Sequence, residues 1–529
     1  MNSKSSYRWQ HFLKQFILLI VGFAIWVGVT NSIKADQPEV ERNTTVTQAY
    51  LANFSRTISP DFFCSNNNAL RVSSWQDPDF VAAVKRLNPQ KIRFPGGTVS
   101  NYWDWRYGGL IEDFREGRAD FFYTFNRDDW QYNSSKLADF LQGLELTNTE
   151  PVFVVNISTS DLASQLEMLR TARDLGLPIK YIELGNELYI DVPDNKDVFP
   201  QPEDYAAEMI DWIDAINQEF PQAKIAVVGV VPTSKKASRF HEWNESLLPE
   251  TLPKADAIVL HIYGSHGLGS DKSKIPTYPF FAIEDTKTIL GQPFVKWQKI
   301  QNASEFQILP KEKSIWITEY NLFENIFYNN KDRKPKVMGS WAHGLYAATM
   351  SLLFLEEPRV EFVCNHQLIS NFYFASILPR ENSFKDPATG DSLAQPYSLS
   401  AAGSALRLYA NAIAGMTQAT PIYFENNSRI KTEDGLEYPT LYGWMFGNKL
   451  GKNSLILNLS DRPQKIDFSA AIESESSYET IFGSPRDLVT GSNVLERRTG
   501  TIGQAFVLPA YSVTQINSPL DRKTKFRSK

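Results

Sequence analysis

One pattern constrains the fold of this chain more than any other. Between about residues 55 and 410, short apolar runs alternate with longer polar or helix-like stretches. Eight such runs follow one another: Asp61–Asn66, Lys91–Phe94, Val152–Ile157, Tyr181–Glu187, Lys224–Val230, Ala257–Tyr263, Ser314–Tyr320 and Val360–Leu368. Continuous apolar strands that alternate with helices are typical of a parallel sheet covered on both faces. Eight units predict an α/β fold, a (β/α)8 TIM barrel over residues 55–410.

Two of the intervening stretches illustrate the expected helices. Leu162–Leu175 and Pro202–Gln218 have helical character, and Pro202 suits the first turn of its helix. No glycine-rich phosphate-binding fingerprint follows the first run, which argues against an open dinucleotide-binding sheet.

The pattern changes at about residue 411. Short segments there alternate polar and apolar residues, and turn signals such as GNKLGKN and GSPRD separate them. This alternation predicts a C-terminal antiparallel β-sandwich over residues 411–518. The segment 36–54 contains a strand-like stretch, Thr44–Phe54, that we expect to join the sandwich before the barrel begins. Residues 519–529 form a basic tail that we expect to be a solvated end.

The first 35 residues have the character of a targeting segment. Lys4, Arg8 and Lys14 precede an unbroken apolar run from Phe16 to Val29. A run of this length fits a secretory signal peptide, and an uncleaved signal anchor is the alternative. We therefore expect a secreted, periplasmic or cell-surface protein that contacts a membrane only if this segment is uncleaved.

Composition narrows the classes of protein. The apolar share of 42% is enough for sizeable cores, and the net charge of −6 argues against a nucleic-acid binder. Cys64 and Cys364 fall in the first and eighth runs, which become neighbours when a barrel closes. They are either a cross-strand disulfide or two separate buried thiols.

Two of the predicted strands finish on glutamate, Glu187 in YIELGNE and Glu319 in SIWITEY. In a (β/α)8 barrel the chemistry lies at the carboxyl ends of the strands, so both carboxylates are expected at one mouth. Strand alternation places Glu319 on the inner face and turns Trp316 and Thr318 toward the helices. A separation of ~5 Å between the carboxylates would suit retaining glycoside hydrolysis.

Polar neighbours accompany these glutamates. Asn186 offers an amide able to hold a sugar hydroxyl, and Arg93 is expected to keep a nearby carboxylate ionised. His261 and Tyr263 share one face of the sixth strand, where the tyrosine hydroxyl is placed to orient the nucleophile.

The loop NYWDWRYGG brings aromatic side chains to the predicted mouth. Tyr102, Trp103 and Trp105 are candidate stacking surfaces for sugar rings, and inward packing is the alternative for some of them. His261 and His266 lack the carboxylate pattern of a metal site, so we expect neither a metal nor another cofactor.

These motifs resemble those of retaining glycoside hydrolases of the large (β/α)8 clan whose catalytic glutamates end strands four and seven. ELGNE, which ends at Glu187, resembles the acid/base motif, and ITEYN around Glu319 resembles the nucleophile motif. Ile92–Trp105 and Ile58–Asn67 are similar to the second and first strands of α-L-arabinofuranosidases and heparanase-like β-glucuronidases. Leu508–Ile516 resembles the last strand of their appended sandwich.

The resemblance implies a role for each matching residue. Glu187 becomes the general acid/base and Glu319 the nucleophile. Asn186 would contact the sugar 2-hydroxyl, while Tyr263 and Arg93 would hold Glu319 and support its charge.

The implied substrate is a poly- or oligosaccharide, and its sugar is left open. Tyr320 stands where arabinofuranosidases usually have tryptophan, and Leu188 stands where the heparanase-like enzymes usually have proline. The alternative function is a non-catalytic carbohydrate-binding or cell-wall-associated protein on a glycosidase scaffold.

Overall fold

The computed structural model describes residues 46–69, 72–110, 136–231, 238–265, 279–307, 309–324, 336–370, 374–379, 395–432, 435–473, 475–491, 494–503 and 506–518. The expected signal segment 1–35, residues 36–45, His266 and the basic tail 519–529 lie outside these residues. Among the helices described, none has the length and apolar character needed to span a membrane.

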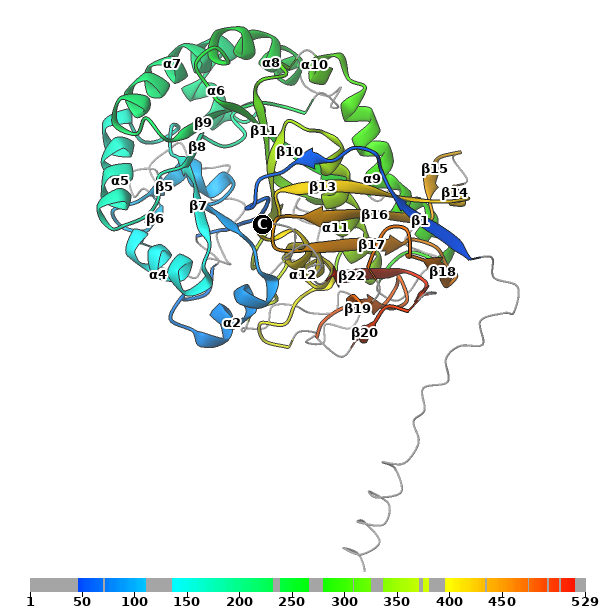
Figure 1. Cartoon of the computed structure of the whole chain (residues 1–529). Coiled ribbons are helices and arrows are strands. Elements are labelled where there is room, and N and C mark those ends of the chain that lie inside the picture. Colours follow the sequence, from blue (N-terminus) through cyan, green and yellow to red (C-terminus); the bar gives the residue numbers. More distant parts are fainter. Residues whose placement is uncertain are drawn as a thin grey trace, which may run out of the picture. The chain divides into compact units, whose positions relative to one another are not determined.

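A closed parallel barrel forms the larger part of the structure (Figure 1). Its strands are β3 (Phe63–Asn66), β4 (Lys91–Phe94), β7 (Glu150–Val155), β8 (Tyr181–Leu184), β9 (Lys224–Val228), β10 (Ala257–Gly264), β11 (Ser314–Leu322) and β12 (Val360–His366). They close in the order β10-β11-β12-β3-β4-β7-β8-β9, so each of the eight predicted runs contributes one strand. The predicted (β/α)8 barrel is confirmed.

Helices surround the barrel strands in the part of the chain that is described (Figure 1). They are α2 (Pro78–Leu87), α4 (Leu137–Thr147), α5 (Leu162–Asp174), α6 (Pro193–Val198), α7 (Pro202–Glu219), α8 (Ser238–Thr251), α9 (Thr286–Gln301), α10 (Ser304–Gln307), α11 (Trp341–Leu353) and α12 (Ala401–Ile413). Side chains cap several of them: Asp77 accepts from the Asp79 amide, and Asp161 accepts from the Ser164 amide. Pro202 opens α7 as expected.

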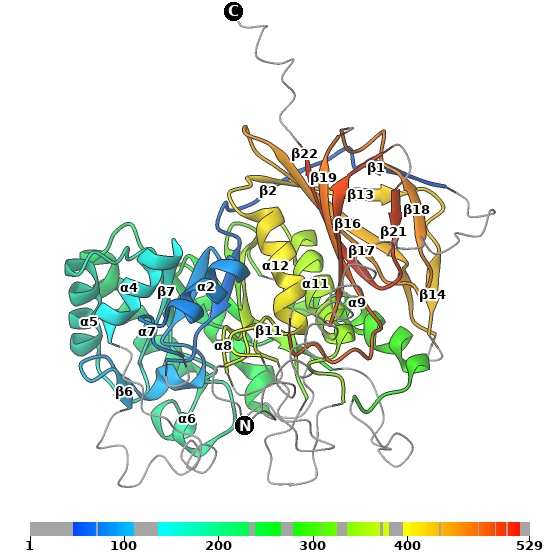
Figure 2. The same cartoon turned by 90° about the horizontal axis from the view of Figure 1, so that it is seen from below.

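The second domain is a curled sheet with ten strands among the described residues (Figure 2). They are β1 (Thr47–Leu51), β2 (Arg56–Thr57), β13 (Gln418–Phe424), β16 (Leu441–Gly447), β17 (Lys452–Asn458), β18 (Gln464–Asp467), β19 (Ser477–Phe482), β20 (Glu496–Thr501), β21 (Phe506–Leu508) and β22 (Ser512–Ser518). Two hairpins stand apart, β5 (Trp103–Asp104) with β6 (Gly109–Leu110) and β14 (Arg429–Lys431) with β15 (Glu437–Pro439).

This sheet is mixed rather than purely antiparallel. β1 pairs antiparallel with β13 and parallel with β18. Since β1 precedes the barrel in sequence, no hairpin fixes its direction relative to β18. The strand-like stretch before the barrel therefore lies in the sheet of the second domain.

The two faces of the sheet bury different cores. Trp444, Phe446 and Leu455 belong to the large core that also contains α11 and α12. Their strand neighbours Met445 and Ile456 belong to a separate core inside the curled sheet. Successive residues of β16 and β17 are therefore apolar and point into opposite cores, because this part of the sheet is buried on both faces.

The barrel interior contains its own cluster, which includes Cys64 and Cys364 joined by a disulfide. Lys91 lies at the amino-terminal end of β4 with no exposed surface. Its ammonium donates to the Asp61 carbonyl and lies 4.9 Å from the centroid of the Tyr181 ring. Burial lowers the pKa of Lys91 to about 8, although Asp61 partly opposes this effect.

Lys91 makes the stability of the barrel depend on pH. Its folded-state pKa of about 8 lies below the ordinary value of 10.5, so the unfolded chain binds this proton more tightly. The charged lysine therefore destabilises the fold below pH 8, and this cost disappears as pH rises toward 10.5.

We predict that the free energy of unfolding of the wild type, minus that of Lys91→Met, rises by about 3 kcal/mol between pH 8 and 10.5. Urea denaturation across this range measures the difference. The buried tyrosines titrate in both proteins and cancel. A difference that stays constant with pH would contradict the prediction.

Candidate active site

A buried arginine organises the carboxyl-terminal mouth of the barrel. Arg93, the third residue of β4, has no exposed surface. Its Nε and Nη2 donate to the Glu183 carboxylate at 2.8–3.0 Å, and its Nη1 donates to Glu319 Oε1 at 2.8 Å. Nη2 also donates to Asn186 Oδ1 at 2.9 Å. One guanidinium therefore fixes two carboxylates and an amide.

The Glu319 carboxylate is held from several strands. Asn66 Nδ2 donates to Oε1 at 3.1 Å, and the Tyr263 hydroxyl donates to Oε2 at 2.5 Å. The loop after β4 passes close by, since a Cβ at Gly97 would lie 2.6 Å from Oε1. Glycine at this position lets the loop approach the carboxylate.

These contacts keep Glu319 ionised. Burial by itself raises the pKa of the carboxyl group, but the positive charges of His261 and Arg93 and the Tyr263 hydrogen bond outweigh burial. The pKa of Glu319 is therefore held well below its usual range.

Glu187 lies beyond its strand rather than on it. β8 ends at Leu184, and the chain turns through Gly185 (φ +89°) before Glu187 adopts a left-handed φ of +50°. The expectation that a strand finishes on Glu187 was therefore wrong, because the strand ends three residues earlier. The Asn101 side chain stabilises the turn by pairing with both the N–H and the carbonyl of Asn186.

The Glu187 carboxylate is less buried than Glu319 and contacts His261. His261 Nδ1 lies 2.9 Å from Glu187 Oε1 and 3.6 Å from Glu319 Oε2. Burial lowers the pKa of His261, but the two glutamates reverse this effect and raise it. A carboxylate oxygen of Glu187 and one of Glu319 lie within 4.8 Å of each other.

The assignment of faces in β11 was wrong. Trp316 packs in the barrel interior with Tyr181 and Phe362, and the Thr318 hydroxyl reaches Glu183 and His261. The register of β11 against β10 shifts between Trp316 and Glu319. This irregularity places one extra residue in β11, so the side chains of Thr318 and Glu319 both reach the polar network at the mouth of the barrel.

Of the three predicted aromatic surfaces, two are buried and one is half-buried. Tyr102 and Trp103 are buried: Tyr102 donates to Asp194, and Trp103 packs edge-on against Phe94. Both rings belong to the large hydrophobic core, so the inward-packing alternative holds for them and they offer no open stacking face. Trp105 is half-buried beside α5, with the Arg106 guanidinium 4.5 Å from its ring centroid.

Three residues of the site were not selected from the sequence: Glu183, Asn66 and Asn101. Glu183 had a usable signal, because a glutamate on the inner face of a barrel strand needs a cationic partner. Asn66 and His366 end β3 and β12, and Asn66 Nδ2 lies 2.6 Å from His366 Nδ1. Asn101 hydrogen-bonds to the backbone of Asn186, which is 85 positions away in sequence, and no local sequence pattern predicts such a contact.

Glu187, His261 and Glu319 bring potential metal-ligand atoms close together. However, Arg93 already places a positive charge 2.8 Å from Glu319. The arrangement therefore favours proton transfer over cation binding.

Comparisons with known proteins agree with this fold. No family model matches the chain. It is 24% identical over 241 residues to a probable α-L-arabinofuranosidase C of Aspergillus fumigatus, covering 41% of this chain and 46% of the relative. It is 27% identical over 317 residues to an intracellular exo-α-(1→5)-L-arabinofuranosidase of Acetivibrio thermocellus, covering 55% and 60%. The chain thus spans about half the length of the curated relatives it matches.

Solved structures match over about nine-tenths of the chain. A family 51 α-L-arabinofuranosidase from Bifidobacterium longum has a TM-score of 0.66 at 16% identity, covering 90% of this chain and all of the other. A 4-O-α-L-rhamnosyl-β-D-glucuronidase from Fusarium oxysporum has a TM-score of 0.51 at 13% identity, covering 89% and all of the other. The chain is therefore similar to α-L-arabinofuranosidases in sequence and fold, as the motifs indicated.

The pair between Arg93 and Glu183 gives a prediction about stability. Glu183→Gln leaves the buried guanidinium short of a counter-charge, and we expect the free energy of unfolding to fall by about 3–5 kcal/mol. Urea denaturation measures the loss. In the control, Glu167→Gln, the exposed pair with Arg106 is broken and the expected loss is below ~1 kcal/mol. Equal losses in the two variants would contradict the central role of Arg93.

Proposed function

We propose that this chain is a retaining glycoside hydrolase that cleaves O-glycosidic bonds of poly- or oligosaccharides by double displacement. One observation carries the proposal: Glu187 and Glu319 have carboxylate oxygens within 4.8 Å of each other, in unequal surroundings. Retaining enzymes need about 5 Å between their carboxyl groups, whereas inverting enzymes need at least ~6.5 Å to admit a water.

The surroundings of the two groups match two roles. Glu319, ionised between Arg93 and Tyr263, attacks the anomeric carbon and forms a glycosyl ester. Glu187 donates its proton to the leaving oxygen as the glycosidic bond breaks. It then takes a proton from water, which attacks the ester and releases Glu319. His261 orients Glu187 through the 2.9 Å contact.

Unpaired amide atoms at the same mouth suit a ligand rich in hydroxyl groups. Asn67, Asn186 and Gln367 are buried, and each has a side-chain amide atom with no hydrogen-bond partner among the described residues. Asn67 and Gln367 directly follow β3 and β12, and Asn186 lies two residues after the end of β8, so all three are at the carboxyl ends of the strands. A sugar would supply the missing partners.

An α-L-arabinofuranoside is the first substrate to test. The curated relatives are named as arabinofuranosidases. Glu183 and Glu319 already neutralise the Arg93 cation, which favours a neutral sugar over a uronate. We also propose that the chain is exported, on the strength of its apolar N-terminal segment. Cell fractionation tests the export, and N-terminal sequencing of the exported form separates a cleaved signal peptide from an uncleaved anchor.

Loss of the nucleophile gives the primary test of activity. Aryl arabinofuranosides, glucuronides, xylosides and glucosides are assayed with the wild type and Glu319→Ala. We expect the wild type to hydrolyse the arabinofuranoside and the variant to lose at least ~10⁴-fold in kcat, because no glycosyl ester can form. Glu437→Gln, at an exposed glutamate of β15, is the control. No Glu319-dependent hydrolysis across the panel would leave the non-catalytic carbohydrate-binding alternative.

Loss of the acid/base gives a different kinetic signature. Glu187→Ala should lose least activity on substrates with good leaving groups, because these need no protonation. Added azide should partly restore turnover by replacing water in the second step. Wild-type activity of Glu187→Ala on a poor leaving group would contradict the assignment.

A further inference from the structure

The seam of the barrel lies directly beneath the proposed nucleophile. β3 and β12 are the first and last strands of the barrel, and they pair in parallel with Cys64 opposite Cys364 and Asn66 opposite His366. The disulfide joins residues 300 positions apart, and both cysteines are fully buried. Every other neighbouring pair of barrel strands is adjacent in the order along the chain, so the seam lacks a local connection.

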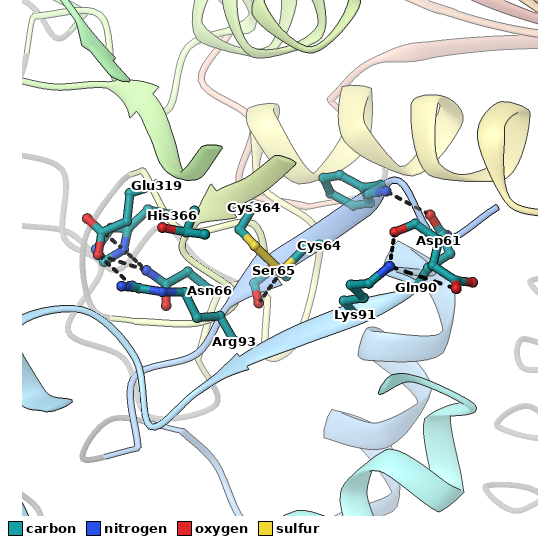
Figure 3. The surroundings of a disulfide bond; sticks show 12 residues. Asp61, Cys64, Ser65, Asn66, Gln90, Lys91, Arg93, Glu319, Cys364 and His366 are labelled. Atoms are coloured by element: carbon teal, nitrogen blue, oxygen red, sulfur yellow. Dashed lines mark hydrogen bonds and ion pairs between the residues drawn. A yellow bond between two sulfur atoms is a disulfide. The ribbon is translucent and has the colours of Figure 1, made fainter. Parts of the chain in front are cut away.

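Because side chains alternate along a strand, residues two positions beyond the cysteines lie on the same face and reach the mouth of the barrel. Asn66 and His366 lie two residues beyond the cysteines and share their inward face. Figure 3 shows the disulfide beside these two side chains and Glu319. Asn66 Nδ2 contacts both Glu319 Oε1, at 3.1 Å, and His366 Nδ1, at 2.6 Å. His366 Nδ1 lies 3.7 Å from Glu319 Oε2.

Contacts that reach one carboxylate from two strands are sensitive to the relative position of those strands. Asn66 contacts Glu319 from β3, His366 contacts it from β12, and the two meet only if the strands keep their register. Hydrogen bonds across the seam include those from Val363 to Phe62 and from Leu368 to Asn66. The disulfide adds a covalent restraint between these two bonds.

We propose that the Cys64–Cys364 disulfide is a positioning element for Glu319, because it holds the Asn66–His366 pair in register against the carboxylate. This inference rests on the proposed role of Glu319 as nucleophile. It assigns the disulfide a part in the reaction geometry in addition to any part in stability.

The test is a cycle of variants assayed on the aryl glycoside that the wild type hydrolyses. The variants are Cys64→Ala/Cys364→Val, which roughly fills the space of the two sulfurs, Asn66→Ala, and the triple combination. We expect the cysteine pair and Asn66→Ala each to lower kcat by about tenfold or more, with KM nearly unchanged, since each weakens a hydrogen bond to a charged group. The triple variant should be no slower than Asn66→Ala, because both changes act through one contact. Additive losses, or full activity of the cysteine pair, would overturn the proposal.

The pH profile separates positioning from simple loss of stability. The groups that face Glu319 are Arg93 on β4, His261 and Tyr263 on β10, His366 on β12, and Glu187. Removing the Asn66 donor leaves these in place but favours the protonated carboxyl group. The acidic limb of kcat/KM should therefore move to higher pH in the cysteine pair and in Asn66→Ala. Val259→Ala, which trims the barrel interior on β10, is the control and should leave the limb unchanged.

A readout without turnover keeps this proposal separate from the proposed function. The NMR titration of His366, assigned with His366→Gln, should change its midpoint in the cysteine pair and not in Val259→Ala. If the wild type hydrolyses no glycoside, the proposed function fails and this titration still reports the contact. An unchanged midpoint together with unchanged kinetics overturns the positioning role.

Folding is checked by near-UV circular dichroism. If the Cys64→Ala/Cys364→Val variant does not fold, the wild type is unfolded, reduced with dithiothreitol, and refolded while both cysteines are kept as free thiols. Dithiothreitol supplies two electrons and two protons, giving two thiols and cyclic oxidised dithiothreitol. Failure of both forms to fold assigns the disulfide to folding alone and overturns the proposal.

Discussion

The ion cluster around Arg93 is the interaction on which the rest of the site depends. A guanidinium with no exposed surface is tolerable only because Glu183 and Glu319 neutralise it and Asn186 takes a further donor. The same contacts hold Glu319 ionised and fix the turn that carries Glu187. Stability and chemistry therefore share one set of hydrogen bonds, which cross the barrel from β4 to β8 and β11.

The barrel supplies what this cluster needs, namely strand ends that converge from separate parts of the chain. Asn66, His261, Tyr263 and His366 come from three strands and meet one carboxylate. Close packing beneath them, including the disulfide and Trp316, leaves these strands little freedom to slide. The irregular register of β11 then brings Thr318 into the network without displacing Glu319. The barrel interior therefore has two layers: a closely packed apolar layer that contains the disulfide, and a polar layer at the carboxyl ends of the strands that surrounds Glu319.

Much of the fold was predictable because it depends on local pattern. Each of the eight apolar runs is a barrel strand, and Leu162–Asp174 and Pro202–Glu219 are helices within a residue of the expected limits. Errors arose where regular alternation broke down, as in the face of Trp316 and the strand end before Glu187. A bulge and a left-handed turn depend on contacts with distant residues, such as the clamp of Asn101 on Asn186. Whether aromatic rings such as Trp103 stack on a ligand or pack inward stayed open, because the position of a loop in the sequence does not report whether a ring faces a cavity or a core.

The sequence by itself determined the barrel architecture, since the order of the strands follows from the periodicity of the chain, and it singled out the two glutamates that meet at one mouth. It left open whether Cys64 and Cys364 pair, because a bond between residues 300 positions apart depends on how the barrel closes. Only the tertiary structure decided that Arg93 binds Glu183 as well as Glu319, and that His261 lies between the two carboxylates. These are side-chain geometries set by packing across the barrel, and no spacing along the chain encodes them.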